Sequence, residues 1–147
     1  MDWSRLDKTG CFLLRKKVLF ICTHNAIRSH MAEAFLRNLK GDRYDAYSAG
    51  TDPTMVDPTA IKVMEEMGID MSGHRSKSLD EYYGRDLDLV ITICNSAKEA
   101  CPFFPGGKEQ DHRSFRDPPE LVEEGMEPLD AFRVIRDEIR EWVINAF

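Results

Sequence analysis

A short apolar run leads directly into a polar loop and then into a helical pattern, and this junction constrains the fold most. The run covers residues 17–22 and is rich in strand-forming side chains, which is typical of a buried parallel strand. From Ser29 onwards, apolar residues recur at helical spacing as far as Gly41, which is placed to cap that helix. The polar loop therefore joins the carboxyl end of a strand to the start of a helix.

The rest of the chain repeats this alternation of strand and helix patterns. Further strands are predicted at 44–49, 87–93 and 111–115, helices at 57–68, 79–85 and 129–147, a helical start at 94–107 and a loop at 117–119. The order predicts an α/β fold, a three-layer sandwich with a central four-stranded parallel sheet flanked by helices. Residues 1–16 have no clear period and are expected to form a flexible extension, and 17–147 form a single domain.

Composition excludes several classes of function. The chain has 147 residues, a net charge of -6 and 31% charged residues, so it lacks the basic character of a nucleic-acid binder. No apolar run is long enough to cross a membrane, and no cleavage site of a secretory signal follows the N-terminal apolar residues. A cytoplasmic monomer is expected, in which cysteines serve catalysis, redox chemistry or metal binding rather than a static disulfide framework. The four cysteines are Cys11, Cys22, Cys94 and Cys101.

The loop places Cys22 and Arg28 around five residues, between a strand and a helix. Backbone N–H groups of such a loop converge with the helix N-terminus and favour an anion at one point. The same field favours a nucleophilic thiolate at Cys22, while Arg28 holds two oxygens of a tetrahedral anion. Ser29 is expected to cap the helix and to donate to the thiolate. The alternative is that Cys22 is only a buried cysteine. The candidate oxyanion-binding residues are Thr23, His24, Asn25, Ala26, Ile27, Arg28 and Ser29.

Two further residues, Cys94 and Asp117, are candidates for the catalytic site. Cys94 comes directly after the strand at 87–93, and Asp117 opens an Asp-Pro-Pro segment. Because ligands of parallel sheets bind beyond the carboxyl ends of the strands, both are expected near Cys22. Asp117 has the chemistry of a general acid, but Asp-Pro is also a common turn opener.

The loop resembles the signature of low-molecular-weight tyrosine phosphatases and of the thioredoxin-coupled arsenate reductases that share their fold. It is most similar to the reductase loop Cys-Thr-His-Asn-Ser-Ala-Arg-Ser-Gln, and the similarity extends from Lys17 over residues 47–51, 73–78 and 132–139. Three positions depart from that pattern, namely Ala26, Ile27 and His30, and they concern substrate affinity rather than the fold.

His24 stands where the phosphatases usually have glycine. Histidine tolerates a positive φ better than most residues, and a solvent-facing place in the loop is favoured for His24 over a catalytic role.

The resemblance implies a mechanism and a set of catalytic residues. Cys22 attacks arsenate and Asp117 protonates the leaving oxygen. Cys94 then attacks Cys22 and releases arsenite, and Cys101 attacks Cys94 to free Cys22. Thioredoxin or a similar dithiol protein reduces the final Cys94–Cys101 disulfide, and Arg28 holds the oxyanion, which is arsenate or a phosphate-like anion.

The spacing of Cys94 and Cys101 leaves other readings open. Residues seven apart in a continuous helix lie about 10 Å apart along its axis, so a disulfide requires this segment to unwind. The two cysteines could instead pack in a core, or bind zinc with Cys22 or His112, although the spacing is unusual for zinc.

Several expectations concern what surrounds this chemistry. By resemblance, Lys77 stands where some relatives carry an acidic ligand of a monovalent cation, so no metal and no cofactor are expected. His74 and Arg75 are expected to serve packing and surface charge, and Cys11 to be an incidental thiol. The alternative functions are a tyrosine or small-molecule phosphatase, and a module that senses oxyanions or redox state without turnover.

Overall fold

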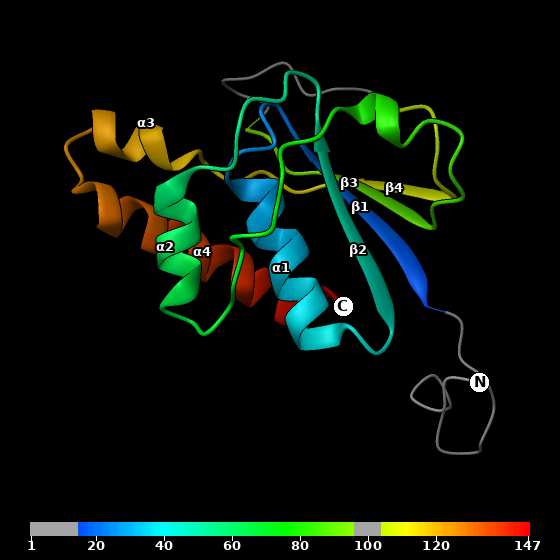
Figure 1. Cartoon of the computed structure of the whole chain (residues 1–147), viewed down its shortest axis with the longest axis horizontal. Coiled ribbons are helices and arrows are strands. Elements are labelled where there is room, and N and C mark those ends of the chain that lie inside the picture. Colours follow the sequence, from blue (N-terminus) through cyan, green and yellow to red (C-terminus); the bar gives the residue numbers. More distant parts are fainter. Residues whose placement is uncertain (1–14, 96–103) are drawn as a thin grey trace.

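Four parallel strands form one sheet in the computed structural model, which describes residues 15–95 and 104–147 (Figure 1). The order across the sheet is β2-β1-β3-β4. The strands are β1 (Lys16–Cys22), β2 (Tyr44–Gly50), β3 (Leu89–Thr92) and β4 (Glu109–His112). The helices are α1 (Arg28–Lys40), α2 (Pro58–Glu65), α3 (Pro118–Glu123) and α4 (Pro128–Ala146), with a 3-10 turn η2 (Leu79–Glu81). The predicted α/β fold with a four-stranded parallel sheet flanked by helices is confirmed.

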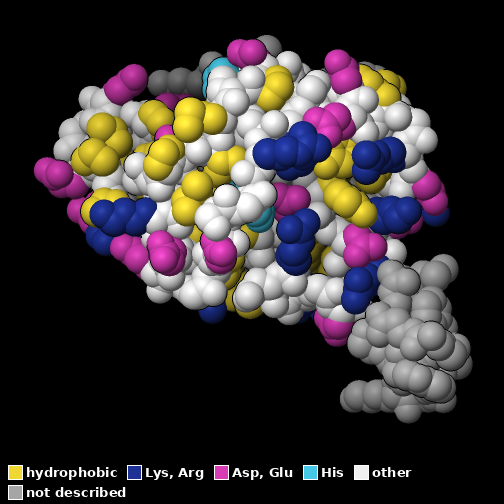
Figure 2. All heavy atoms as spheres, viewed as in Figure 1, with side chains coloured by type: hydrophobic (Ala, Val, Ile, Leu, Met, Phe, Trp, Pro, Cys, Tyr) yellow, Lys and Arg dark blue, Asp and Glu magenta, His cyan; other side chains and the backbone are white. Residues whose placement is uncertain are grey.

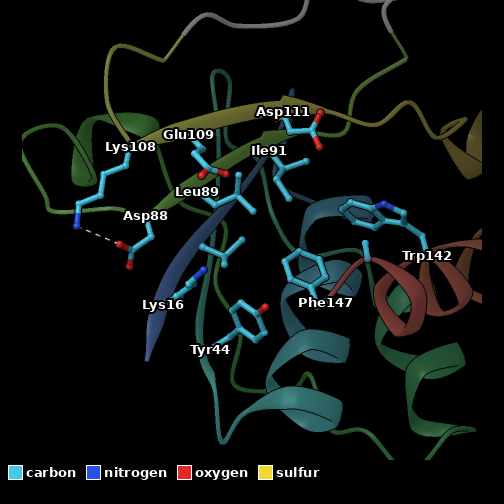
Figure 3. A pocket seen from close by; sticks show the side chains of 12 residues that line it. Lys16, Tyr44, Asp88, Leu89, Ile91, Lys108, Glu109, Asp111, Trp142 and Phe147 are labelled. Carbon is cyan, nitrogen blue, oxygen red and sulfur yellow. Dashed lines mark ion pairs between the residues drawn. The ribbon is translucent and has the colours of Figure 1, made fainter. Parts of the chain in front are cut away.

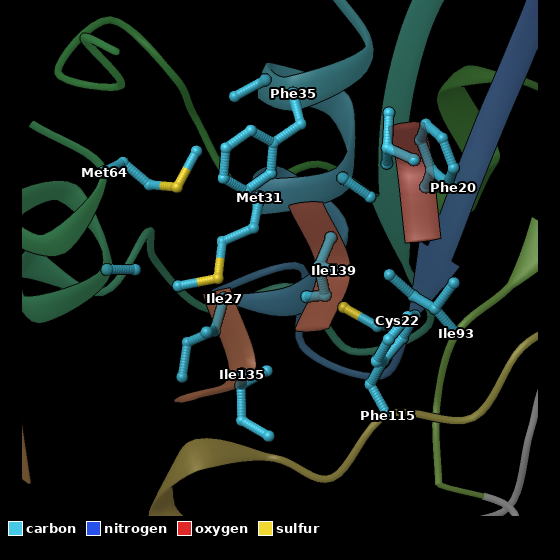
Figure 4. Packing of buried hydrophobic residues seen from close by; sticks show 14 of the residues in the cluster. Phe20, Cys22, Ile27, Met31, Phe35, Met64, Ile93, Phe115, Ile135 and Ile139 are labelled. Atoms are coloured by element: carbon cyan, nitrogen blue, oxygen red, sulfur yellow. The ribbon is translucent and has the colours of Figure 1, made fainter. Parts of the chain in front are cut away.

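The central strand β1 supplies both sides of the core because its side chains alternate between the two faces. Val18 and Phe20 pack with helices α1, α2 and α4 on one face, whereas Leu19 and Ile21 pack with η2 and its neighbours on the other. Figure 4 shows Cys22 at the end of β1, among apolar side chains of the helical face. The last residue of the strand is therefore held by the core and still faces the loop.

Helix α4 covers the sheet as its sequence pattern predicts. Phe132, Ile135, Ile139 and Val143 are all buried and lie on one face. This face packs against the helical side of the sheet with α1 and α2 (Figure 1). The predicted amphipathic helix at 129–147 is confirmed, beginning one residue earlier at Pro128.

The Asp-Pro-Pro segment is not a loop, and that prediction is wrong. Asp117 is the N-cap of α3, and Pro118 and Pro119 occupy its first turn. Proline suits this position because its fixed φ is helical and its missing N–H would have no partner in the helix. The predicted loop is therefore the start of a short helix.

Two other predicted elements differ in extent. β4 ends at His112 rather than at residue 115, because only Glu109–His112 pair with β3. The helix predicted at 79–85 is the single 3-10 turn η2, and a left-handed Gly84 follows it. Lys16, assigned to the extension, is the first residue of β1, where it pairs with Tyr44. Residues 1–14 of the extension lie outside the described residues.

The surface carries charges of both signs. On the face in Figure 2, Lys and Arg side chains are interspersed with Asp and Glu, and apolar side chains lie between them. Within residues 15–95 and 104–147, no helix combines the length and the apolar character needed to span a bilayer.

Candidate active site

The loop between β1 and α1 borders a pocket of about 220 Å³ at the carboxyl ends of the strands. This is where ligands of parallel sheets bind. The pocket is lined by Cys22, His24, Ala26, Ile27, Arg28, Thr54, Asp57, Asp117 and Pro119. The structure therefore brings the predicted nucleophile, the predicted arginine and the predicted acid to one place.

The backbone of the loop is turned so that its carbonyl groups face the surrounding chain. The carbonyls of Thr23, His24 and Ala26 accept hydrogen bonds from the backbone N–H groups of residues 52, 54 and 57, at 2.9, 3.2 and 3.0 Å. In a planar trans peptide the N–H group points away from the carbonyl of the same peptide unit. The N–H groups that follow these three carbonyls therefore point to the inner side of the loop, where an anion is favoured.

Asn25 fixes the shape of the loop. It is fully buried. Among the described residues, it is the one non-glycine residue with a positive φ, which is 49°. Its side-chain oxygen accepts from the Lys77 N–H at 2.7 Å. The positive φ in the loop falls on Asn25 and not on His24, and asparagine is one of the few residues besides glycine that adopt the left-handed region. His24 faces solvent as predicted, with a side chain 49% exposed.

Ser29 acts on Cys22 rather than as a helix cap. Its hydroxyl lies 2.9 Å from Cys22 Sγ and accepts a hydrogen bond from Asn25 Nδ2 at 2.8 Å. Because one lone pair is used by the amide, the hydroxyl proton is placed to donate to a thiolate. The N-cap of α1 is Ile27, which makes no side-chain capping bond, so the predicted cap at Ser29 is wrong. The predicted contact with the thiol is present.

Gly50, at the end of β2, packs directly against the backbone of the loop. A Cβ at this position would lie 2.5 Å from the Thr23 carbonyl oxygen, 2.8 Å from the Asn25 nitrogen and 3.0 Å from the Cys22 carbonyl oxygen. All three are backbone atoms of the loop, so no side chain can move aside. The end of β2 must therefore be a residue without a side chain if the loop is to keep this shape.

Replacing Gly50 by alanine is expected to displace the loop and to lower kcat/KM by roughly 100-fold, the scale for a shift of about 1 Å at an active site. Overpacking should also destabilise the fold by about 1–3 kcal/mol. Gly73→Ala is the matched control, because nothing lies within 4 Å of its added Cβ. Steady-state kinetics and thermal unfolding measure the two effects, and unchanged kinetics for Gly50→Ala would contradict this role.

Arg28 connects the loop to the segment that carries the predicted acid. Its guanidinium is buried, donates to the Phe115 carbonyl at 3.0 Å and lies 3.6 Å from the Asp117 carboxylate. Asp117 makes no capping bond to α3, although it is the N-cap residue. The carboxylate therefore lies beside Arg28 and faces the pocket that Cys22 also lines.

Cys94 lies at the same edge of the sheet as Cys22. β1 and β3 are adjacent and in register, with Ile21 opposite Thr92, and Cys94 follows two residues later. Cys94 is buried, and Cys22 is a free thiol. Cys101 and Cys11 lie outside the described residues. The zinc alternative through His112 gains no support, since both ring nitrogens face hydroxyl groups, those of Thr92 and Ser114.

A buried polar cluster lies behind the loop. Lys77 Nζ donates to Ser48 Oγ at 3.3 Å, and Ser48 Oγ donates to Glu33 Oε2 at 3.1 Å. Burial lowers the pKa of Lys77, and the nearby Glu33 only partly opposes this. Burial raises the pKa of Glu33, but the His30 hydrogen bond and the charges of Lys77 and His74 oppose it, and the net pKa lies below the usual value. The lysine is thus a buried cation close to the loop asparagine.

A second hollow lies between one face of the sheet and the C-terminal end of α4. The groove of about 360 Å³ in Figure 3 is bordered by Lys16, Tyr44 and Phe147, and the ion pair between Lys108 and Asp88 measures 3.3 Å. None of the predicted site residues lines it. The groove is larger than the pocket at Cys22 but lacks a nucleophile.

Sequence reasoning missed several residues that build the site. Ser48 and Gly50 lie within residues 47–51, which carry the family resemblance, and Gly50 directly follows the strand predicted at 44–49. Asp57 begins the helix predicted at 57–68 and caps α2, accepting from the Thr59 N–H at 2.8 Å. No sequence pattern marked Thr54, which lines the pocket, or the Phe115 carbonyl, which accepts from Arg28. The strand end at Gly50 was the available signal, since glycine there permits close approach of another backbone segment.

Comparisons with known proteins agree with this geometry. A family model described as low molecular weight phosphotyrosine protein phosphatase matches residues 17–145. An arsenate reductase of Halalkalibacterium halodurans is 41% identical over 125 residues, which cover 85% of this chain and 90% of that protein. A solved arsenate reductase in a phosphate-binding state has a TM-score of 0.75 at 32% identity, covering 89% of this chain and 95% of its own.

A third relative adds the thioredoxin-dependent branch. The thioredoxin-dependent arsenate reductase of Corynebacterium glutamicum has a TM-score of 0.62 at 28% identity, covering 90% of this chain and 64% of its own. The two solved arsenate reductases thus share the overall fold of this protein. The chain belongs to the low molecular weight phosphotyrosine protein phosphatase family.

Proposed function

We propose that this chain reduces arsenate to arsenite through a relay of three cysteines that thioredoxin or a similar dithiol protein regenerates. The observation that carries the proposal is the placement of two described cysteines at one edge of the sheet. Cys22 is a free thiol in an anion-binding loop, and Cys94 is buried just beyond the end of the neighbouring strand β3. A phosphatase needs only the first thiol, whereas a two-electron reduction needs a second sulfur that forms and passes on a disulfide.

The first step forms a bond between Cys22 and arsenic. The Cys22 thiolate attacks arsenate, held by Arg28 and the inward N–H groups of the loop, and an oxygen of arsenate leaves. Asp117 enters this step as the protonated carboxylic acid and donates the proton that allows this oxygen to leave as water, which leaves the carboxylate that faces Arg28. The carboxylate lies in the same pocket as Cys22, which suits a general acid.

The second step transfers the electrons. The Cys94 thiolate attacks Cys22 Sγ, the sulfur–arsenic bond breaks, and its electron pair stays on arsenic, which leaves as arsenite. Two thiols become one disulfide as As(V) becomes As(III), so electrons balance. Cys101 then attacks Cys94, freeing Cys22, and an external dithiol reduces the Cys94–Cys101 disulfide.

The same pocket supports a second, weaker activity. Attack by Cys22 on a phosphate ester needs the loop, Arg28 and Asp117 but not Cys94. We therefore expect slow hydrolysis of aryl phosphates alongside arsenate reduction. We also expect the enzyme to act as a cytoplasmic monomer, without nucleic acid or membrane as partner.

Trapping the intermediate tests the relay. In Cys101→Ser, one arsenite per chain should form in a single turnover and the reaction should then stop, because the Cys22–Cys94 disulfide cannot be resolved. Peptide mapping by mass spectrometry should find that disulfide. Cys11→Ser is the matched control and should turn over like the wild type. A disulfide containing Cys11, or continued turnover of Cys101→Ser, would contradict the proposed order of sulfurs.

A further inference from the structure

Three metal-ligating atoms converge behind the oxyanion loop. His30 Nδ1 lies 2.9 Å from His74 Nδ1. Glu33 Oε2 lies 3.4 Å from the first nitrogen and 3.3 Å from the second. All three atoms fall within 4.8 Å of one another. Among the described residues, this is the one group of three side chains that could hold a metal ion.

We propose that His30, Glu33 and His74 bind one divalent transition-metal ion of the zinc class. In a tetrahedral zinc site with bonds of about 2.0–2.1 Å, ligand atoms lie about 3.3 Å apart. Two edges of the observed triangle already have this length, and the edge between the histidines needs to lengthen by only a few tenths of an ångström. A water molecule or the Ser48 hydroxyl supplies the fourth ligand, since Ser48 Oγ lies 3.5 Å from His30 Nδ1.

The ligands are held in place before any ion binds. His30 and Glu33 lie three residues apart on α1, so they project from the same helix face. His74 comes from the segment between α2 and η2, where its N–H bonds to the Met71 carbonyl at 3.0 Å. The side chains of His30 and Glu33 are 0% and 6% exposed, and that of His74 is 12% exposed, which leaves an approach from solvent.

The charges nearby decide which metals fit. Arg37 lies 3.2 Å from Glu33 Oε1, and Lys77 reaches the carboxylate through Ser48. These cations weaken any ion held mainly by charge, such as calcium, magnesium or potassium. Two imidazoles favour zinc, cobalt or copper, whose bonds to nitrogen depend less on net charge.

The position couples the cluster to the catalytic loop. Ser29 and His30 are neighbours in the chain, and the Lys77 N–H bonds to Asn25, which in turn bonds to Ser29. A metal joining α1 to the 71–78 segment would hold the two segments that position the loop. The inference rests on these described residues and does not depend on the proposed reaction.

Titration of the full chain with zinc, and with cobalt as a visible probe, tests the site. We expect one equivalent to bind and to raise the melting temperature. Cobalt should show visible bands of a tetrahedral nitrogen and oxygen site, without the near-ultraviolet band of thiolate ligation. His30→Gln and His74→Gln, on different segments, should each weaken binding by more than about 100-fold, since even outer partners of metal ligands cost 10- to 100-fold.

Two further variants sharpen the test. His112→Gln removes an exposed histidine elsewhere and should bind zinc like the wild type. Lys77→Met removes a buried opposing charge and should tighten binding by about tenfold or more. Binding that persists in both histidine variants, a thiolate band that disappears in Cys22→Ser, or no binding by the wild type would each overturn the proposal.

Discussion

Replacing Cys94 by serine is expected to abolish arsenate reduction, with a loss of at least about 1,000-fold, while aryl phosphate hydrolysis stays within about twofold of the wild type. Hydrolysis needs Cys22, Arg28 and Asp117, which line one pocket and which the substitution leaves in place. Reduction needs a second thiolate that attacks Cys22 Sγ and breaks the sulfur–arsenic bond. A serine hydroxyl cannot do this, because it cannot form a disulfide. The measurement is arsenite formation with a dithiol reductant, beside aryl phosphate release by the same preparation.

The contrast between the two activities makes this variant its own folding control. Cys94 is fully buried, so loss of both activities would report a damaged fold. Cys22→Ser should remove both activities because each begins with the same attack. If Cys94→Ser still reduced arsenate, the proposed relay would be wrong. The proposed role of the anion pocket would not be contradicted.

Replacing Arg28 by lysine is expected to lower kcat/KM for arsenate and for an aryl phosphate alike, by about 100- to 1,000-fold each. Lysine keeps the charge but loses the planar fork that holds two anion oxygens at once. It also cannot reproduce both observed contacts, the bond to the Phe115 carbonyl at 3.0 Å and the approach to Asp117 at 3.6 Å. Steady-state kinetics on both substrates measure the effect.

The matched control is Arg116→Lys. Arg116 lies on the surface near the same segment, and it pairs with Glu120 and Glu124 rather than with the pocket. It should therefore change kcat/KM little. If Arg28→Lys lowered only arsenate reduction, Arg28 would belong to the relay and not to anion binding. The parallel loss expected here separates it from Cys94→Ser.

The strand–loop–helix junction was predictable because its signals are local. Strand formers before Cys22 and helical spacing after Ser29 settle where the chain turns, and the turn dictates where backbone N–H groups converge. The pairing of Cys22 with Arg28 and the position of α4 followed from the same kind of evidence. Each of these predictions depended on residues within one or two helical turns of one another.

Element ends were predicted less well because long-range contacts compete with local pattern. β4 ends at His112 because its partner β3 ends at Thr92, although the strand was predicted at 111–115. The Asp-Pro-Pro segment has turn chemistry and helix-start chemistry at once. The ion pair with Arg28 gives Asp117 a role that its own neighbours could not reveal.

The sequence by itself determined the α/β fold, the anion loop and its nucleophile, since periodicity and loop chemistry act between neighbours in the chain. Only the tertiary structure decided which residues complete that site. Gly50 meets the loop 2.5 Å from the Thr23 carbonyl, and Asn25 rather than His24 takes the left-handed turn. His30 meets His74 across 44 positions. Such pairs depend on how β2 and the segment after α2 pack against α1, and no local pattern encodes that packing.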